Sequence, residues 1–423
     1  MKLALFGVGN AGIRLVDQLC ASQRDRGVDF VDDRVLAFNT AATAGRAAPY
    51  IPAERHLLLG DTPPDIITES PSADDDEARR KIKPGAAGDP DLAATVARRE
   101  LPEIRRQLDR IDDTDIGASL VVVGLGGGTG SGVGAVLVEE LQAVYESPVY
   151  VLGVLPAASE PEERQLNAAR AIRTLVPLSE AVLTVDNDAW HTGDGPVEDS
   201  YADINERIAD RITALFGAGE SDTAAASEVH MDPSDIRRTL ATGGLASLGY
   251  AEFDLGRNSG GLLAWLRSLF GGGNDEEPQV DAATIKQLVS RTIESRLTLP
   301  CGVDSADRVL LVLSGPPGDL SRKGFETGRF LLEEETDTVD VLAGDEPIPG
   351  AGTISATVLL SNVTDVPRLE AIQERAVATL DDGSAAAATE RQRSTPEPLD
   401  DAPDRPTTDL EGLGSDADPS GDD

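Results

Sequence analysis

The 423-residue chain is poor in the residues that form cross-links and metal centres. It has two cysteines, Cys20 and Cys301, which are too few for a disulfide framework, and an intracellular chain would keep both reduced. The three histidines, His56, His191 and His230, are too scattered to indicate a metal site, and we predict none. The 40% of hydrophobic residues still provide enough material for a sizeable core.

Long apolar runs are also missing. No window approaches about 18 consecutive apolar residues, so we predict no transmembrane helix. The N-terminal residues MKLALFGVGN run directly into a glycine loop, without the apolar region and cleavage site of a signal peptide. We therefore expect a cytoplasmic protein.

Positively charged residues are scarce, and lysine is much rarer than arginine. The chain has 37 Lys+Arg against 75 Asp+Glu, which gives a net charge of -38. Such a surface repels phosphate polymers, so we exclude general binding to nucleic acid or anionic membranes. Of the 37 basic residues only five are lysine, which leaves 37 - 5 = 32 arginines. An acid excess with few lysines is typical of proteins that work in molar salt, where a Debye length of ~3 Å screens repulsion. An acidic interaction protein at ordinary salt is the alternative.

The negative charge is concentrated in two segments but is not confined to them. Residues 381–423 hold 13 acids and 3 arginines, and we predict a disordered acidic tail there. Residues 61–77 hold 7 acids and no base, which indicates a solvated loop. The rest of the chain keeps a net charge of -38 + 10 + 7 = -21, so its folded part is itself acidic, which favours the high-salt interpretation.

The length suggests two or more domains, and the pattern of elements indicates an α/β fold. In the first half, short strands that are apolar on both faces alternate with helices, as in a parallel sheet covered on both sides. We predict an α/β nucleotide-binding domain over 1–202, a connecting core helix over 203–220 and a smaller α+β domain over 221–380. The predicted strands are Lys2–Phe6, Val35–Phe38, Leu120–Val123, Val149–Val154, Val182–Val185, Val309–Leu313, Val339–Leu342 and Ser355–Ser361. Further helices are predicted after Asp281 and from Pro367.

The first glycine loop, Gly7-Val-Gly-Asn-Ala-Gly12, follows a strand and precedes a helical pattern. Glycines let the backbone approach a phosphate, which then lies on free N–H groups at a helix N-terminus. A dinucleotide fold would place an acid about 20 residues further on, for the ribose. The next strand ends instead at Asn39 and Thr40, so the loop does not favour a nicotinamide cofactor.

The second glycine loop is more specific. The heptad Gly126-Gly-Gly-Thr-Gly-Ser-Gly132 lies between an apolar strand and a strong helix, which is no place for a flexible linker. Its backbone N–H groups and the hydroxyls of Thr129 and Ser131 are candidate donors to phosphate oxygens. No lysine follows, so it is not a Walker loop.

This heptad resembles the phosphate loop of the tubulin/FtsZ superfamily, and the chain most resembles the CetZ group of tubulin-like proteins of halophilic archaea. The resemblance covers residues 1 to about 380. The stretches that support it, in matching order, are Gly153-Val-Leu-Pro156, Leu166-Asn-Ala-Ala-Arg170, Asp186-Asn-Asp-Ala-Trp190, Leu215-Phe-Gly-Ala-Gly219, Gly315-Pro-Pro317 and Gly344-Asp-Glu-Pro-Ile-Pro349. It implies a parallel-sheet nucleotide-binding domain, a connecting helix and a smaller C-terminal domain.

The resemblance also implies a pocket for GTP or GDP with Mg²⁺. Glu160 would accept hydrogen bonds from the ribose, Asn187 and Asn205 would bind the guanine edge, and Tyr201 would stack on the base. From the residues alone, Asn187 is equally a turn residue, Asn205 a helix-start residue and Tyr201 a packing residue. The phosphates would be held by Gly9, Asn10, Ala11, Gly12, Ile13, Arg14, Gly126, Gly127, Gly128, Thr129, Gly130 and Ser131.

Two carboxylates are candidates for catalysis. Asp232 and Asp235 precede or begin a helix that has Pro233 at its first position, so they are also candidates for helix caps. By resemblance, they lie in an activation loop, 228–236, that one subunit inserts against the nucleotide of the next. There a carboxylate can orient water for attack on the γ-phosphate, while Mg²⁺ neutralises charge. CetZ relatives tend to have Glu where Asp235 stands, which favours slow turnover.

Together these features predict a cytoskeletal GTPase that assembles head to tail and acts in cell shape control. Its partners would be copies of itself or paralogous tubulin-like subunits. The apolar segment 261–270 is either a locally packed helix or a surface for a neighbouring filament or a peripheral membrane contact. The alternative from another class is a non-catalytic nucleotide-binding regulator of filaments that an active paralogue forms.

Overall fold

The computed structural model describes residues 1–41, 48–60, 86–193, 195–218, 220, 231–255, 280–294 and 296–379. These residues belong to one compact unit, 1–379. The predicted tail 381–423, the acidic loop 61–77, the apolar segment 261–270 and the first three residues of the predicted activation loop lie outside the described residues.

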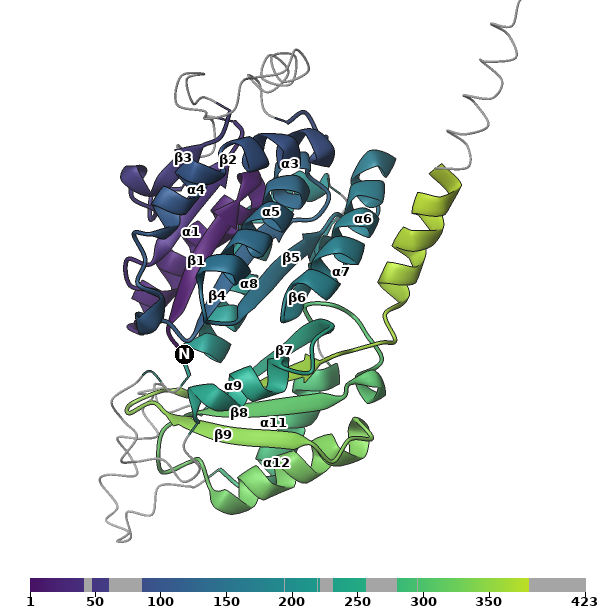
Figure 1. The fold of residues 1–423 in the computed structure, drawn as a ribbon. Helices are drawn as coiled ribbons and strands as arrows, with labels where there is room; N and C mark the ends of the chain where they lie inside the picture. Colours follow the sequence, from purple (N-terminus) through teal and green to yellow (C-terminus); the bar gives the residue numbers. More distant parts are fainter. Residues whose placement is uncertain are drawn as a thin grey trace, which may run out of the picture. The chain divides into compact units, whose positions relative to one another are not determined.

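One sheet runs through the described part of the chain, in the strand order β3-β2-β1-β4-β5-β6-β7-β10-β8-β9 (Figure 1). Its first six strands are parallel, and their order reverses between β1 and β4. In open α/β sheets, ligands bind beyond the carboxyl ends of the strands at such a reversal. These strands are β1 (Leu3–Val8), β2 (Val35–Asn39), β3 (His56–Leu58), β4 (Ala118–Gly124), β5 (Val149–Leu155) and β6 (Ala181–Asp186).

The other four strands continue the sheet past β6. β7 pairs parallel to β6 through Leu245 and Ala246, and β10 is antiparallel to both β7 and β8. β9 is parallel to β8. Their bounds are β7 (Leu245–Asp254), β8 (Arg308–Gly315), β9 (Val341–Pro347) and β10 (Thr353–Ser361).

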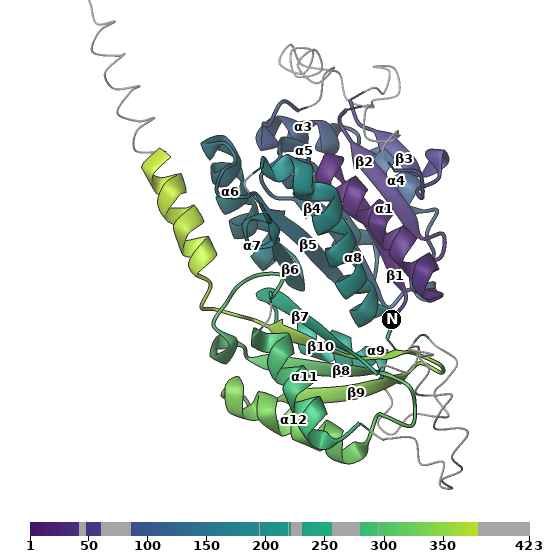
Figure 2. The same ribbon diagram turned by 180° about the vertical axis from the view of Figure 1, so that it is seen from behind.

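Helices cover both faces of the sheet. In the first part α1 and α8 lie together on one face (Figure 2), and α3, α5 and α6 lie on the other (Figure 1). The helices are α1 (Gly9–Arg26), α3 (Pro90–Arg99), α4 (Leu101–Leu108), α5 (Gly128–Val144), α6 (Glu162–Leu178), α7 (Asn187–Trp190), α8 (Tyr201–Phe216), α9 (Pro233–Leu240), α11 (Ala282–Glu294), α12 (Arg322–Glu335) and a last helix over 367–379. Short 3₁₀ turns occupy Ala53–Arg55, Asp113–Asp115, Val197–Ser200 and Val303–Ser305.

The hydrophobic core forms two layers, one on each face. In β1, Leu3 and Leu5 contribute to the layer under α1 and α8, whereas Phe6 and Val8 contribute to the other layer. All these side chains are buried, as the two-sided apolar strands predict. The α/β fold class is therefore confirmed.

Three of the predicted helices are present, although the connecting helix predicted over 203–220 begins two residues earlier and ends at Phe216. The stripe after Asp203 belongs to α8, the stripe after Asp281 belongs to α11, and the last helix begins at Pro367. Asp89 caps α3 by accepting hydrogen bonds from the Asp91 and Leu92 amides.

The strand predictions are wrong in three places. Strand β3, His56–Leu58, was not predicted. Strand β7 was not predicted; its alternating face is interrupted at its outer end, where Glu252 and Phe253 are exposed. Strand β9 begins two residues later than the predicted strand Val339–Leu342, at Val341, and continues to Pro347; the Val339 side chain is 91% exposed.

Candidate functional site

A cavity of about 610 Å³ opens at the point where the strand order reverses. It lies beyond the carboxyl ends of the parallel strands, where the loops after β1, β2, β4, β5 and β6 converge. Of the residues predicted to bind nucleotide, those that line it are Gly9, Asn10, Ala11, Arg14, Gly126, Gly127, Gly128, Thr129, Gly130, Glu160, Asn187, Tyr201 and Asn205.

The two glycine loops touch each other, backbone against backbone. A Cβ added to Gly9 would lie 3.2 Å from the Gly130 nitrogen, and Gly9 has a φ of +69° that favours glycine. A Cβ added to Gly130 would meet the Gly124 carbonyl oxygen at 2.4 Å. Only glycines permit this approach, so the two loops form one continuous floor of backbone.

The floor consists of two helix starts. Helix α1 begins at Gly9, and α5 begins at Gly128. The first N–H groups of a helix have no partner within it, and the helix dipole makes this end positive. Arg14 and Arg164 also line the cavity. The floor therefore suits an anion such as a phosphate chain, despite the acidity of the protein as a whole.

Two side chains that the sequence analysis did not select connect β2 to this floor. The Asn39 side-chain amide donates through Nδ2 to Asn10 Oδ1 at 2.9 Å, and the Thr40 and Thr129 hydroxyls are 2.7 Å apart. Thr40 Oγ1 also accepts from the Ala86 amide. Ala86 belongs to a third loop of the site, residues 86–89, which leads into α3. The signal for both residues was their position at the end of a parallel strand beside β1.

Asn167 holds the third loop against the second. Its amide donates to the Gly88 carbonyl at 2.8 Å and to the Gly126 carbonyl at 3.3 Å. A Cβ on Gly128 would meet the Asp89 nitrogen at 2.6 Å, so these loops are also in backbone contact. Three loops, from three distant parts of the sequence, thus surround the anion position.

Glu160 lies on the wall of the cavity, with its side chain almost fully buried. One carboxylate oxygen accepts from the Ala157 amide at 2.8 Å, and the other is paired with Arg164. Each carboxylate oxygen can accept a second hydrogen bond, so Glu160 keeps capacity for the ribose hydroxyls. Glu160 thus lies on the cavity wall, as the predicted contact with the ribose requires.

The base-binding candidates also lie on the cavity wall. Asn187 is the first residue of α7, Tyr201 begins α8, and Asn205 follows one turn later. Burial, together with the charge of the adjacent Glu160 carboxylate, raises the pKa of the Tyr201 hydroxyl above its usual range. Tyr201 therefore stays protonated at neutral pH.

Three predicted phosphate ligands do not line the cavity. Ile13 is fully buried in the core beneath α1, and a Cβ on Gly12 would lie 2.0 Å from the Val122 carbonyl oxygen. The Ser131 hydroxyl donates to the Leu125 carbonyl at 2.7 Å. These residues shape the loops from behind.

Asp232 and Asp235 lie away from this cavity, at the start of α9. Asp232 caps the helix by accepting from the Ser234 amide at 2.7 Å, and Asp235 is half-buried in the first turn. The capping interpretation of Asp232 is thus correct. Neither carboxylate lines the cavity of its own chain.

No group of three or more His, Cys, Asp or Glu side chains in the described part of the chain is arranged to hold a metal ion. Mg²⁺ in nucleotide sites is commonly held by phosphates, waters and one or two protein oxygens. The Thr40 and Thr129 hydroxyls and the Glu163 carboxylate line the cavity and are suitable oxygen donors. The site therefore fits an ion that arrives with the phosphates.

Comparisons with known proteins agree with this geometry. The Tubulin/FtsZ family GTPase domain matches residues 2–193, and the tubulin-like CetZ C-terminal domain matches residues 194–378. Tubulin-like protein CetZ1 of Haloferax volcanii is 39% identical over 389 residues, which cover 90% of this chain and 93% of the relative. The chain belongs to the CetZ family of tubulin-like proteins.

Two solved CetZ structures show the same fold. CetZ1 of H. volcanii, a GDP-bound monomer, superposes with a TM-score of 0.73 at 35% identity and covers 90% of this chain and 100% of that one. CetZ2 of H. volcanii, a GTPγS-bound protofilament, also gives 0.73, at 32% identity over 91% and 100% of the two chains. No helix in the described part of this CetZ chain is long and apolar enough to cross a membrane.

Proposed function

We propose that this CetZ protein binds GTP and GDP in the cavity and assembles head to tail into filaments, and that it acts in cell shape control in the cytoplasm. The observation that carries the proposal is the floor of two glycine loops in backbone contact, at the reversal of the strand order. GDP bound to CetZ1 and GTPγS bound in a CetZ2 protofilament support both the ligand and the assembly.

In this proposal the chain supplies the two halves of a catalytic centre on different surfaces. Backbone N–H groups of the loops at Gly9 and Gly128, with Arg14, bind the phosphates, while Glu160 and Asn187 orient the nucleoside. Mg²⁺, held through the Thr40 and Thr129 hydroxyls or Glu163, would neutralise charge on the phosphates. The water would be oriented by Asp235 of the next subunit, positioned by the Asp232 cap of α9.

This division makes hydrolysis depend on assembly, because the cavity and α9 of one chain lie apart. A contact between two different surfaces stays open unless its rotation closes a ring, so it extends into a filament. Turnover per subunit should therefore rise with protein concentration. The subunit at the open end of a filament would keep its GTP until the next subunit arrives.

The first test is to identify the nucleotide released from purified protein, and then to measure turnover and light scattering with GTP in molar salt. We expect guanine nucleotide, and turnover that rises with protein concentration. Bound guanine nucleotide without turnover at any concentration would favour the alternative, a non-catalytic regulator of paralogous filaments. Absence of guanine nucleotide, with no uptake of added GDP, would refute the proposal.

A further inference from the structure

The last helix, 367–379, lies beside α6 in both views of the ribbon (Figures 1 and 2). Its apolar side chains Leu369, Ile372 and Ala376 are buried, and Leu369 and Ile372 belong to the core layer that contains Ile172 and Leu175 of α6. The helix is thus fixed by ordinary packing. What its polar face touches is more specific.

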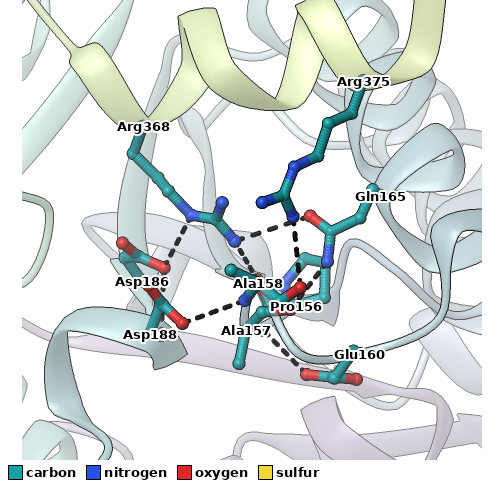
Figure 3. Close-up of polar contacts among 9 residues, drawn as sticks. All are labelled: Pro156, Ala157, Ala158, Glu160, Gln165, Asp186, Asp188, Arg368 and Arg375. Atoms are coloured by element: carbon teal, nitrogen blue, oxygen red, sulfur yellow. Dashed lines mark hydrogen bonds and ion pairs between the residues drawn. The ribbon is translucent and has the colours of Figure 1, made fainter. Parts of the chain in front are cut away.

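Arg368 is inserted from this helix into the wall of the site, where its side chain is 10% exposed (Figure 3). Its Nε donates to Asp186 Oδ1 at 3.3 Å, and its Nη2 donates to the Pro156 carbonyl at 2.7 Å. Nη2 also lies 3.5 Å from Gln165 Oε1. One guanidinium therefore connects the end of β6 to the loop that follows β5.

The first of these partners positions the base-binding segment. Asp186 is the last residue of β6, and its Oδ1 caps α7 by accepting from the Asp188 amide at 3.1 Å. Asn187, which lines the cavity, is the next residue of the chain. The Arg368–Asp186 contact therefore acts on the backbone that presents Asn187.

The second partner positions the ribose side. Pro156 is followed by Ala157, whose amide donates to Glu160 Oε1, and by Ala158, whose amide donates to Asp188 Oδ1 at 3.0 Å. Arg375, about two helical turns after Arg368, donates to the Ala158 carbonyl at 3.1 Å (Figure 3). The loop that carries Glu160 is thus held from behind by two arginines of one helix.

The chemistry of this contact favours arginine specifically. A planar guanidinium has several donors in a fixed fork, so it can bond a carboxylate and a carbonyl at once, which a lysine ammonium on a flexible stem does less well. Asp186 is 3% exposed, so its carboxylate has lost most of its hydration and depends on its remaining partners. The contact is therefore sensitive to small movements of the helix.

We propose that Arg368 is a positioning residue for the nucleoside half of the ligand, and that docking of helix 367–379 is coupled to guanine nucleotide binding. The inference rests on the proposed function and adds a regulatory element to it: whatever moves this helix changes nucleotide affinity. Because coupling between two sites is reciprocal, bound nucleotide must in turn stabilise the docked helix by the same free energy.

The first test compares the affinities of wild type, Arg368→Gln and Arg368→Lys for GDP and GTP. A coupling of ordinary strength would make Arg368→Gln bind about 5- to 150-fold more weakly, and by the same factor for both ligands. The equal factor follows because the polar partners of Arg368 are Asp186, Pro156 and Gln165, none of which belongs to the two glycine loops. Arg368→Lys should recover part of the loss. Arg322→Gln, which removes an exposed arginine of α12, is the matched control and should bind as wild type.

A second measurement separates positioning from a general loss of stability. Tripolyphosphate and guanosine are used as competitors of a fluorescent GDP analogue. Positioning predicts that Arg368→Gln weakens guanosine and leaves tripolyphosphate unchanged, whereas a destabilised fold weakens both. Equal weakening of both, or unchanged guanosine binding, would overturn the proposal.

A third measurement needs no variant. Hydrogen exchange in helix 367–379 of the wild-type chain should slow when GDP is added, and α12 should serve as the internal control with no change. Unchanged exchange in 367–379 at saturating GDP would overturn the coupling while leaving the proposed function intact. If the wild type binds no guanine nucleotide at all, it is the proposed function that fails.

Discussion

The two halves of the candidate pocket are built by different means. The phosphate half consists of main chain: Gly9, Gly130 and Gly124 approach so closely that no side chain fits between them. The nucleoside half consists of side chains, such as Glu160 and Asn187, that project from separate segments of the chain. The phosphate half depends on the absence of side chains at its glycines. The nucleoside half depends on contacts that Arg368 of the last helix makes with its supporting segments.

The two halves therefore differ in rigidity: the phosphate half is rigid, and the nucleoside half can be adjusted. Backbone packed on backbone has no rotamers to change, so the anion site is rigid and insensitive to distant events. A wall of side chains held from behind by Arg368 responds to whatever displaces its support. The comparison predicts that variants in the phosphate half act on all ligands, and variants in the nucleoside half discriminate among them.

Gly130→Ala should have the largest effect. Its methyl group would lie 2.4 Å from the Gly124 carbonyl oxygen, so the connection between β4 and α5 must change its shape. We expect loss of nucleotide binding and a decrease of about 3 kcal/mol in the free energy of unfolding, as for severe overpacking. Calorimetric titration with GDP and denaturant unfolding measure the two effects.

Gly127→Ala is the matched control for stability. An added Cβ there has its nearest neighbour, the Gly124 oxygen, at 3.7 Å, an ordinary contact. Its free energy of unfolding should stay within about 0.5 kcal/mol of wild type. Equal destabilisation by both substitutions would show that the loops are not held by the close approach of Gly130 to Gly124.

Asp235→Ala should have the next largest effect, on turnover alone. Removing a group that orients the attacking water commonly lowers the rate by about 100-fold or more. GDP affinity should not change, because Asp235 does not line the cavity of its own chain. Asp235→Glu, which restores the longer carboxylate, should hydrolyse GTP at least as fast as wild type. Equal turnover in wild type and Asp235→Ala would show that this carboxylate has no catalytic role.

Asn187→Ala tests the nucleoside half. Loss of a buried polar partner of the base should reduce the preference for GTP over ATP by about 10- to 100-fold, measured as a ratio of dissociation constants. Asn167→Ala is the control from the phosphate half, since it holds the Gly88 and Gly126 carbonyls. It should weaken GTP and ATP equally. If Asn167→Ala changed the ratio and Asn187→Ala did not, the division of the pocket would be wrong.

The smallest effect concerns pH. Burial raises the pKa of the Asp186 carboxyl, and Arg368 opposes this without cancelling it. A raised folded-state pKa means that the stabilising contribution is present below the unfolded pKa and is lost as pH rises through the folded value. We compare the free energies of unfolding of Asp186→Asn and wild type from about pH 4 to pH 7. As pH rises, the wild type should lose stability relative to the variant. A shift towards wild type would show that its partners lower this pKa.

Much of the fold was predictable from local patterns, because each pattern reports a local requirement. The two-sided apolar strands predicted a covered parallel sheet, and the stripe at Ile204, Ile208 and Ile212 predicted α8. Strand β7 was missed because Glu252, which is exposed at its outer end, breaks the apolar alternation of the preceding residues. The sequence could not show that β7 would pair with β6 and continue one sheet, since pairing is a long-range event.

For the site, the glycine heptad and the resemblance predicted most of the cavity lining, but not the residues behind it. Asn167 lies in the stretch Leu166–Arg170 that supports the resemblance, but neither Thr40 nor Asn167 was predicted to act in the site. They matter because of the loops that the fold places beside them. The apolar stripe of helix 367–379 was readable, but the target of Arg368 was not.

The sequence by itself determined the fold class, the family and the presence of two glycine loops between strands and helices, because glycine spacing and apolar periodicity are properties of neighbouring residues. Only the tertiary structure decided that Ser131 and Ile13 lie behind the pocket, and that Asp235 lies outside it. Only it joined Arg368 to Asp186, 182 residues apart in the chain. The physical reason is that a buried contact depends on which elements the core brings together, and this is a property of the whole sheet.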